Sequence, residues 1–330
     1  MTNIKKMQKK AIKSYVHEPV LVGEILDILR VDKFAHLKSQ ATFIDATLGN
    51  AGHSTEFVKK GINVLGIDAD AEMIEFAEKR LHENLRAGGR RLEGSDPHLS
   101  RKVGSHKIVH GNFKDIKQIA HKHGLENVEG ILFDLGVSTH QLMSKSKGMS
   151  FAEPDVLLDM RLGFERDSVM AKDILNLSSK GDLIDMFSVT CDFDYTRKLV
   201  AEVVNRRKER SFEKVGDLLD LTKNLRIGKK SELHPATLPF LALRIRVNNE
   251  LENLVNTLPQ AIDLLVKGGR LAVISFHSGE DVIVKNSFKK MDTEGVGKII
   301  TKKPVIPTES EIKINPKSRS AKLRVIEKSV

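Results

Sequence analysis

Cysteine is nearly absent from this 330-residue sequence, which contains one, Cys191. A single cysteine excludes a disulfide framework and a cysteine-ligated zinc cluster, and it is typical of a protein in the reducing cytoplasm. Long apolar runs are also missing, because none approaches the ~18 residues that a membrane-spanning helix needs. The histidines show no metal-ligand spacing, so we expect no bound metal.

Acidic residues are missing from residues 1–14, which hold five lysines. This segment has neither the apolar core of a secretory signal nor the arginines of a mitochondrial presequence, so we interpret it as a flexible basic arm. Residues 197–230 form a second basic cluster within a net charge of +10. A third consists of Lys313, Lys317, Arg319, Lys322 and Arg324. Positive charge can serve solubility alone, but its clustering favours a polyanionic partner, most simply nucleic acid.

Short apolar runs alternate with helical spacing from residue 42 onward. The predicted strands are residues 42–47, 63–68, 107–111, 130–135 and 270–276, with two further β-like runs at 297–302 and 321–327. The predicted helices are residues 54–60, 70–86, 114–123, 237–266 and 280–291, and residues 87–106 are interpreted as a long surface loop. This alternation predicts an α/β fold in which helices cover both faces of a parallel sheet.

The alternation stops after residue 138. The residues that follow show helical patterning, many charges and no convincing strand. An all-helical block within a strand–helix series indicates an inserted domain. We therefore predict one domain formed by residues 1–138 and 233–330, and an inserted helical domain formed by residues 139–232.

A glycine-containing turn follows the first predicted strand in residues 45–54, DATLGNAGHS. Glycines there let a ligand approach the backbone, and the helix that follows offers free N–H groups, although such turns also join strands and helices that bind nothing. The second strand ends at Asp68, nineteen residues after Gly49, where a carboxylate either accepts hydrogen bonds from ribose hydroxyls or caps the next helix. Asp70 can take the capping role instead. Together these features indicate an adenosine cofactor, and the incomplete G-x-G-x-x-G pattern counts against NAD.

Two further strand ends carry candidate residues. Phe113 follows the third strand, where its ring packs either on an adenine or in the core. Asp134 ends the fourth strand, at the edge where ligands bind such sheets. Because a charge at a mostly buried strand end needs a partner, we expect this carboxylate to face the adenine or the reacting centre.

Nine blocks of the sequence, in order, resemble one family. They are HEPV at 17–20, DATLGNAGHS at 45–54, GIDAD at 66–70, GILFDLGVS at 130–138, LDMR at 158–161, HPAT at 234–237, ALRI at 242–245, VISFHS at 273–278 and NPKSRSAKLR at 315–324. The match extends from about residue 15 to residue 328. On these blocks the sequence resembles the MraW family of bacterial methyltransferases, which methylate the N4 amino group of a cytidine in 16S rRNA.

The resemblance implies a class I, Rossmann-like methyltransferase sheet with an inserted helical substrate-recognition domain. It implies S-adenosylmethionine as the cofactor and a cytidine in the decoding region of 16S rRNA as the substrate. The expected setting is the small ribosomal subunit in the cytoplasm, with the protein a monomer or a homodimer. The family's cofactor contacts correspond to Ala51, Gly52, His53, Asp68, Phe113, Asp134 and Gln141.

The sequence also departs from the family pattern. Ala51 replaces a glycine, which is compatible with cofactor binding while its φ stays negative. Gly279 and Val282 replace a bulky residue and a cation in the block that begins at His277. These differences concern the fine shape of the substrate site more than the class of reaction.

The cytosine amino group is a poor nucleophile because its lone pair is conjugated with the ring. The reaction therefore needs hydrogen-bond acceptors that aim this lone pair at the methyl group, and positioning supplies much of the acceleration. The candidates are Asp134, Ser138, Asp159 and His277. Asp159 alternatively forms a structural ion pair with Arg161, and His277 alternatively makes a structural hydrogen bond.

A base in structured RNA must be unstacked before it enters such a pocket. The basic insert is the natural clamp for the surrounding RNA. Its candidate phosphate contacts are Arg206, Arg207, Lys208 and Arg210. The alternative for these residues is a solvated helix face.

Two other functions remain open at this point. A DNA amino-methyltransferase usually has an Asp/Asn/Ser-Pro-Pro-aromatic motif after the fourth strand, and residues 134–137, DLGV, lack it. A non-catalytic RNA-binding protein of ribosome assembly, built on the same fold, is distinguished from an enzyme by measuring turnover.

Overall fold

The computed structural model describes residues 19–35, 41–88, 103–144, 146–163, 168–223, 225 and 234–330. The predicted basic arm and most of the predicted loop at 87–106 lie outside these residues. The chain forms two compact units, Met1–Gly136 with Glu252–Val330, and Val137–Leu251. Among the described helices, none combines the length and the hydrophobicity that crossing a bilayer requires.

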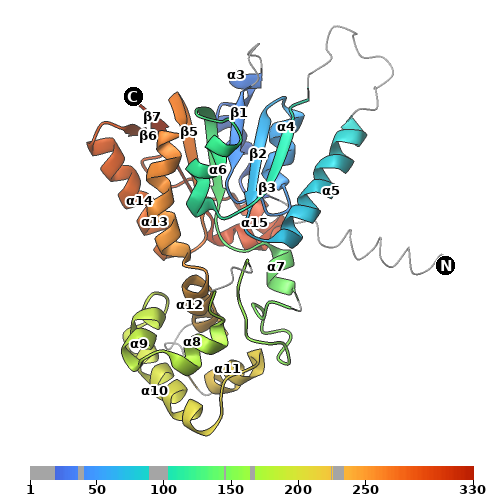
Figure 1. Cartoon of the computed structure of the whole chain (residues 1–330). Coiled ribbons are helices and arrows are strands. Elements are labelled where there is room, and N and C mark those ends of the chain that lie inside the picture. Colours follow the sequence, from blue (N-terminus) through green and yellow to red (C-terminus); the bar gives the residue numbers. More distant parts are fainter. Residues whose placement is uncertain are drawn as a thin grey trace, which may run out of the picture. The chain divides into compact units, whose positions relative to one another are not determined.

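A seven-stranded sheet with the order β3-β2-β1-β4-β5-β7-β6 organises the first unit (Figure 1). The strands are β1 (Thr42–Asp45), β2 (Asn63–Asp68), β3 (His106–His110), β4 (Val128–Asp134), β5 (Leu265–Ser275), β6 (Gly297–Ile299) and β7 (Lys322–Lys328). The first five strands in the sheet order are parallel, β7 is antiparallel to β5, and β6 is antiparallel to β7. The strand order reverses between β1 and β4, the point where ligands bind in sheets of this kind. The predicted α/β class with a Rossmann-like sheet is confirmed.

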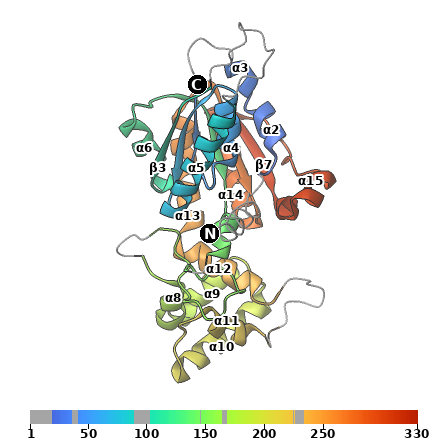
Figure 2. The ribbon, with the colours of Figure 1, turned by 90° about the vertical axis from the view of Figure 1, so that its right-hand side faces the viewer.

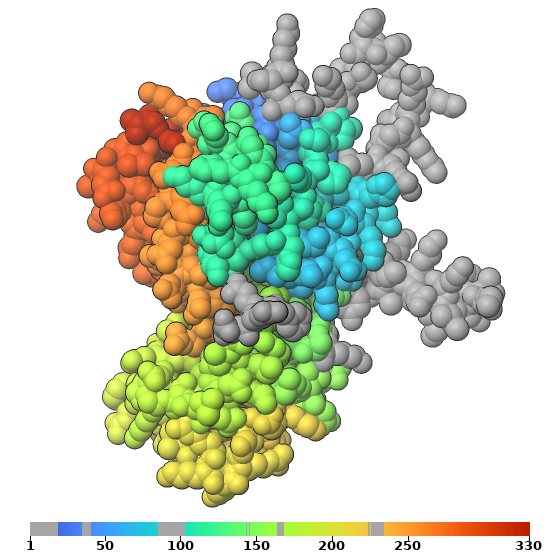
Figure 3. All heavy atoms as spheres, viewed as in Figure 1, coloured from blue at the N-terminus to red at the C-terminus, as the bar shows by residue number. Residues whose placement is uncertain are grey.

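Alternate residues of the central strands enter two separate cores, one on each face of the sheet. Phe43 of β1 belongs to one core and its neighbour Ile44 to the other. The helices are α2 (Val22–Ile28), α4 (Gly52–Lys59) and α5 (Ala71–Gly88) on the first face, and α6 (Ile116–Lys122), α13 (Glu250–Asp263) and α14 (Ser278–Thr293) on the second. Figure 2 shows α2 and α6 on opposite sides of the sheet. In Figure 3, atoms of the green and orange segments that contain α6 and α13 cover the sheet.

The second unit is helical. Its helices are α7 (Thr139–Met143), α8 (Ala171–Leu177), α9 (Lys180–Ser188), α10 (Phe193–Glu209), α11 (Val215–Thr222) and α12 (Thr237–Val247). Their shared core includes the fully buried side chains of Phe187, Leu199 and Phe212. Within the described part of this unit, the only β-type pairing is one isolated bridge between Leu157 and Lys214.

The segment predicted as a single helix over residues 237–266 forms two helices, α12 and α13. Asn249 between them has a φ of 49°, a left-handed conformation that ends a helix and that asparagine adopts more readily than most residues. Because α12 packs on α8 and α9, it belongs to the helical unit, which extends to Leu251 and beyond the predicted boundary at 232. Substrate recognition by this unit remains a prediction.

Four short elements of the first unit were not predicted. They are α2, α3 (Val31–Ala35), α15 (Glu309–Ile314) and the 3-10 helix η3 (Pro316–Ser320). Each is seven residues or shorter, too short for a 3.6-residue period to emerge from the sequence. The strand β5 also begins at Leu265, ahead of the predicted 270, because the backbone passes through Gly268 at a φ of 78° and continues the strand.

Candidate active site

The turn between β1 and α4 is left-handed at two residues. Gly49 has a φ of 51° and Ala51 a φ of 59°. The N–H of Ala51 donates to the carbonyl of Leu48 at 2.8 Å, and its methyl group is buried. The condition of a negative φ at Ala51, named from the sequence, is therefore not met. The turn keeps a glycine-like geometry although alanine pays roughly 1–2 kcal/mol of strain for it.

Gly52, the first residue of α4, lies against Pro19. A Cβ at position 52 would be 2.9 Å from the Cβ of Pro19, closer than real side chains approach each other. Glycine is therefore required for the segment 19–21 to lie directly on the turn. Two of the nine sequence blocks meet at this contact.

Asp45 connects the end of β1 to the first turn of α4. Its buried carboxylate accepts a hydrogen bond from the Ser54 hydroxyl at 2.6 Å. Burial raises the pKa of Asp45, and the hydrogen bond from Ser54 together with the nearby His53 offsets this only in part. Ser54 therefore fixes the direction in which α4 leaves the turn.

Asp68 at the end of β2 holds the glycine turn from the other side. Its Oδ2 accepts the N–H of Gly49 at 2.7 Å, and its Oδ1 accepts the N–H of Asp70 at 2.9 Å. Burial raises the pKa of Asp68 to about 6, although these two hydrogen bonds favour the charged form. The first turn of α5 is capped by Asp70, which accepts the N–H of Glu72 at 3.1 Å. A carboxylate has roughly four lone-pair sites, so Asp68 retains acceptor capacity for ribose hydroxyls.

Asp134 at the end of β4 has an acceptor that the described protein does not use. Its Oδ2 lies 3.6 Å from Nε2 of His53, which is 5% exposed. Its Oδ1 is buried and has no hydrogen-bond partner among the described residues. The backbone at Asp134 is fixed, because its N–H donates to the Thr47 hydroxyl at 2.6 Å. An unpartnered buried carboxylate oxygen is costly, so this atom is the strongest sign of a missing ligand donor.

Phe113 lies at the start of the 3-10 helix η2 (Phe113–Asp115), after β3. Its ring meets Phe133 of β4 edge to face, with centroids 5.7 Å apart, and it packs on the core of the second sheet face. The ring is only partly buried, so core packing and contact with an adenine are compatible.

The residues at the ends of β1, β2 and β4 fit a nucleoside-type cofactor. The side chains of Asp68 and Asp134 offer acceptors, which suit the hydroxyl and amino donors of an adenosine carrying an amino-acid tail. The left-handed turn at Gly49 and Ala51 brings backbone close to this acceptor pair. The arrangement therefore agrees with the cofactor that the family resemblance implies.

His277 begins α14, at the end of β5, as its N-terminal cap. Its Nδ1 lies 3.4 Å from the N–H of Glu280, and Glu280 in return accepts the N–H groups of Phe276 and His277 at 2.8 and 3.2 Å. Such a reciprocal arrangement satisfies the free N–H groups of a helix start. His277 thus makes the structural hydrogen bond that was its alternative role, and a catalytic role for it stays a prediction.

The neighbouring Asp281 anchors α14 to β7. Its carboxylate accepts two hydrogen bonds from Arg324, at 2.6 and 3.2 Å, and both side chains are nearly buried. Burial favours the neutral form of Asp281, but the hydrogen bond and charge of Arg324, helped by Lys322, outweigh it and lower the pKa of Asp281. One cation of the third basic cluster is therefore part of the fold.

Three of the predicted cofactor or catalytic residues belong to the second unit and are described within it. Ser138 caps α7 by accepting the N–H of Gln141 at 3.1 Å, while Oε1 of Gln141 accepts the N–H of Ser138 at 2.8 Å. Asp159 is 7% exposed and binds the guanidinium of Arg161 at 2.7 and 2.8 Å. This hydrogen bond raises the pKa of Arg161. Structural contacts are thus present at all three, and their roles toward cofactor and substrate stay predictions.

The four predicted phosphate contacts on α10 differ from one another. Arg206 donates to Asp217 at 3.1 Å. Arg207 donates to the carbonyls of Leu175 and Ser178, at 3.0 and 2.8 Å, and so caps the end of α8. Lys208 is exposed, and Arg210 is 72% exposed with a long 3.5 Å contact to Asp217. Phosphate binding stays a prediction, and only Lys208 and Arg210 extend into solvent.

Sequence reasoning missed the residues that hold the site in place. Thr47, Ser54 and Glu280 support Asp134, Asp45 and the start of α14 respectively. Each of them lies within or next to a block that resembles the family. A hydroxyl or carboxylate one turn from a strand end was therefore the available signal.

Comparison with known proteins agrees with this geometry. A model of the MraW methylase family matches residues 14–329. Ribosomal RNA small subunit methyltransferase H of Clostridioides difficile (strain 630) is 36% identical over 334 residues, covering 94% of this chain and 98% of the relative. The protein of the same name from Fusobacterium nucleatum subsp. nucleatum is 38% identical over 332 residues, covering 94% and 96%.

A solved structure of an rRNA methylase from Streptococcus thermophilus aligns with 91% of this chain and 92% of its own, at 11% identity and a TM-score of 0.40. The match of the family model over nearly the whole chain, together with the two relatives, confirms the resemblance found in the sequence. The chain therefore belongs to the MraW methylase family and is a methyltransferase that uses S-adenosylmethionine.

Proposed function

We propose that this protein transfers a methyl group from S-adenosylmethionine to the N4 amino group of a cytidine in the decoding region of 16S rRNA. The two relatives are named as methyltransferases of small-subunit ribosomal RNA, which supports rRNA as the substrate. The observation that carries the chemistry is the unpartnered Oδ1 of Asp134 at the end of β4.

Bound S-adenosylmethionine supplies a methyl group on a positively charged sulfur. Asp134 accepts an N–H of the cytosine amine through Oδ1, which draws the nitrogen lone pair out of conjugation and aims it. Thr47 fixes the backbone of Asp134, and His53 lies 3.6 Å from the other carboxylate oxygen. The amine loses a proton after attack, so orientation matters more than a strong base. Contact of Asp134 with the cofactor is the competing role that the family resemblance implies.

We propose that the helical unit recognises the RNA around the target. Lys208 and Arg210 at the end of α10 are its candidate phosphate contacts, because their charges extend into solvent. Reversing both to glutamate is expected to weaken RNA binding and flatten its salt dependence. Affinity for S-adenosylmethionine should hardly change. An unaltered salt slope would leave these residues as a solvated face.

The decisive test is nucleoside mass spectrometry of 16S rRNA from cells with and without the gene. We expect N4-methylated cytidine to disappear on deletion, to return with the wild-type gene, and to stay absent with an Asp134→Asn gene expressed at the same level. Purified small subunits and free 16S rRNA, offered in parallel, identify the form of the substrate. Methylated DNA, or RNA binding without turnover, would instead favour a DNA amino-methyltransferase or a non-catalytic assembly protein.

The proposal also covers the setting of the reaction. The partner is 16S rRNA, within the small ribosomal subunit, and the compartment is the cytoplasm. A monomer and a homodimer are distinguished by sedimentation of the purified protein with and without RNA.

A further inference from the structure

The third basic cluster lies at the same edge of the sheet as the candidate active site. Because β7 is antiparallel to β5, its first residue, Lys322, pairs with Ser275 near the carboxyl end of β5. Asp134 of β4 pairs with Ile274 of β5 at the same level. Two strand spacings, about 10 Å, therefore separate Asp134 from the start of β7. That is within reach of a nucleotide next to one bound at Asp134.

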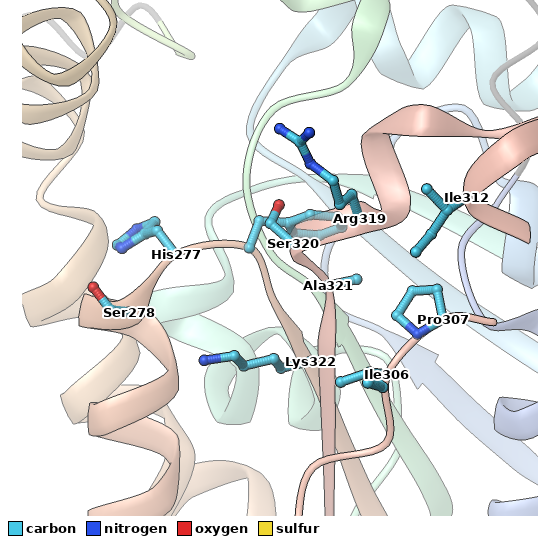
Figure 4. Close-up of a pocket in the computed structure, with 10 residues that line it drawn as sticks. His277, Ser278, Ile306, Pro307, Ile312, Arg319, Ser320, Ala321 and Lys322 are labelled. Atoms are coloured by element: carbon cyan, nitrogen blue, oxygen red, sulfur yellow. The ribbon is translucent and has the colours of Figure 1, made fainter. Parts of the chain in front are cut away.

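A cavity of about 300 Å³ opens at this place (Figure 4). One wall is polar and comes from the start of α14, from η3 and from the start of β7, with His277, Ser278, Arg319 and Lys322. The opposite wall is apolar and includes Ile306, Pro307 and Ile312. A ligand that fits both walls carries an anionic group beside an apolar, planar or sugar-like body.

One charge of the polar wall, that of Arg319, is not neutralised by any described residue. Arg319 is exposed and makes no hydrogen bond or ion pair with any described residue. Lys322 lies 3.4 Å from Asp281, which Arg324 already holds in two shorter hydrogen bonds. The nearby acid Glu311 is used by the backbone N–H of Leu21, at 2.8 Å. The guanidinium of Arg319 thus remains available for an external anion.

One residue of the apolar wall, Ile306, is unusually exposed for an aliphatic side chain. Ile306 is 63% exposed, although it lies next to the end of β7 at which buried residues begin. An aliphatic surface next to an arginine is suited to a base or ribose attached to a phosphate, since bases pack on apolar side chains while arginine binds phosphate oxygens in pairs.

We infer that this cavity is a subsite for a nucleotide of the RNA next to the methylated cytidine. Arg319, aided by Lys322, binds its phosphate, and Ile306, Pro307 and Ile312 contact its base or ribose. The inference rests on the proposed function, because it places a second nucleotide of the same substrate. The inference gives residues 315–322 a role in RNA binding, and none of these residues is among the predicted cofactor contacts.

The test compares Arg319→Gln with Lys313→Gln in the full chain, with 16S rRNA as the probe. Lys313 is a matched control because it is exposed, lies in the same cluster and does not line the cavity. We expect Arg319→Gln to weaken RNA binding about tenfold, as for loss of one charge-assisted hydrogen bond, and to reduce the salt slope by ~0.7–0.9. Lys313→Gln should change binding less than twofold, since distant exposed charges are screened.

A second variant probes the cavity without removing charge. Ser320 lines the cavity with an exposed side chain, so Ser320→Trp should fill it with little cost to folding. We expect KM for RNA to rise while the salt slope, kcat at saturating RNA and affinity for S-adenosylmethionine stay as in the wild type.

A modified RNA identifies the phosphate. Replacing single phosphates beside the target cytidine by neutral methylphosphonates should, at one position, weaken binding to the wild type but not to Arg319→Gln. Equal effects of Arg319→Gln and Lys313→Gln would overturn the inference. So would lost cofactor affinity with unchanged RNA affinity, because the cavity would then bind the cofactor's carboxylate. A wild type that neither binds nor methylates rRNA would instead contradict the proposed function.

Discussion

The basic end of α10 and the basic segment before β7 look alike in the sequence, but their cations do different work. On α10, Arg206 and Arg207 bind Asp217 and the carbonyls at the end of α8. In the other segment, Arg324 is tied to Asp281, whereas Arg319 has no described partner and lines a cavity. The density of positive charge therefore indicates an anion-binding role for both regions. Only the contacts within the folded protein show which cation is left for a ligand.

The same distinction separates two carboxylates of the sheet edge. Both oxygens of Asp68 accept backbone N–H groups, one from Gly49 of the glycine turn and one from Asp70. One oxygen of Asp134 has no hydrogen-bond partner among the described residues. Replacing a group whose hydrogen bonds hold the fold is expected to lower stability. Replacing a group with unused hydrogen-bonding capacity is expected to change ligand binding or the reaction rate.

The largest effect is expected from replacing a cation whose charge is fully engaged in contacts within the fold. Arg324→Met leaves the buried carboxylate of Asp281 without its two hydrogen bonds from Arg324, which should lower the free energy of unfolding by about 3–5 kcal/mol. Chemical denaturation measures it, with Lys322→Met as the control, because Lys322 is 41% exposed and its 3.4 Å contact with Asp281 is long, so that this contact contributes less than ~1 kcal/mol. Equal losses in the two variants would contradict the comparison.

The pH dependence of this pair has a defined sign. Since the folded-state pKa of Asp281 lies below the ordinary value of 3.8, the pair contributes its full stability above that value. The contribution is lost as the pH falls through the lower, folded-state pKa. The wild type should therefore lose stability in acid more steeply than Arg324→Met.

Asp134→Asn keeps the shape of the strand end but removes the anionic acceptor. We expect the rate of methyl transfer to fall about 10²-fold, the effect of losing one preorganised electrostatic group, while cofactor affinity falls much less. Single-turnover kinetics at saturating cofactor and RNA measures this rate. A normal rate would leave Asp134 as a cofactor-binding residue and direct attention to Ser138, Asp159 and His277.

Arg207→Ala should separate structural from exposed cations on α10. It removes two hydrogen bonds from a charged group to the end of α8, so unfolding should become easier by about 1.5–3 kcal/mol. The exposed neighbour Lys208 is the matched control, and Lys208→Ala should change stability by no more than ~0.5 kcal/mol. If Arg207→Ala left stability unchanged and weakened only RNA binding, Arg207 would be a phosphate contact and not a structural cation.

The smallest expected effect concerns the pH dependence of cofactor binding. Asp68 has a pKa of about 6, and the ribose hydroxyls predicted to bind it would donate to its charged form. Affinity should thus be constant above pH 7 and fall by up to ~10-fold per unit below pH 6. Calorimetry with S-adenosylmethionine at several pH values measures this.

Asp68→Asn should flatten the profile, and Asp68→Ala should weaken binding by roughly 1.5–3 kcal/mol. A wild-type profile that is flat down to pH 5 would argue against a ribose contact. Because Asp68 also holds Gly49, the stability of each variant serves as the control.

The sequence was sufficient to predict the sheet and most of its helices, because strands buried on both faces read as short apolar runs. It also brought Asp68 and Asp134 to one edge, since the carboxyl ends of parallel strands meet there. It was not sufficient for Ala51, whose φ of 59° depends on the turn around it. The break at Asn249 and the partners of Arg206 and Arg207 depend on contacts between residues far apart in the chain, which a periodic pattern does not contain.

The segment 19–21 touches two places that a ligand would occupy. Pro19 lies against Gly52 in the cofactor turn, and the N–H of Leu21 donates to Glu311 on α15, the helix that carries Ile312 in the wall of the cavity. A molecule that shifts this segment at one end therefore changes the energy of the other. Thermodynamic coupling is reciprocal. If cofactor binding changes the affinity of the cavity for its ligand, occupation of the cavity changes the affinity for the cofactor by the same factor. A largely buried segment of three residues thus links the energies of the turn and the cavity.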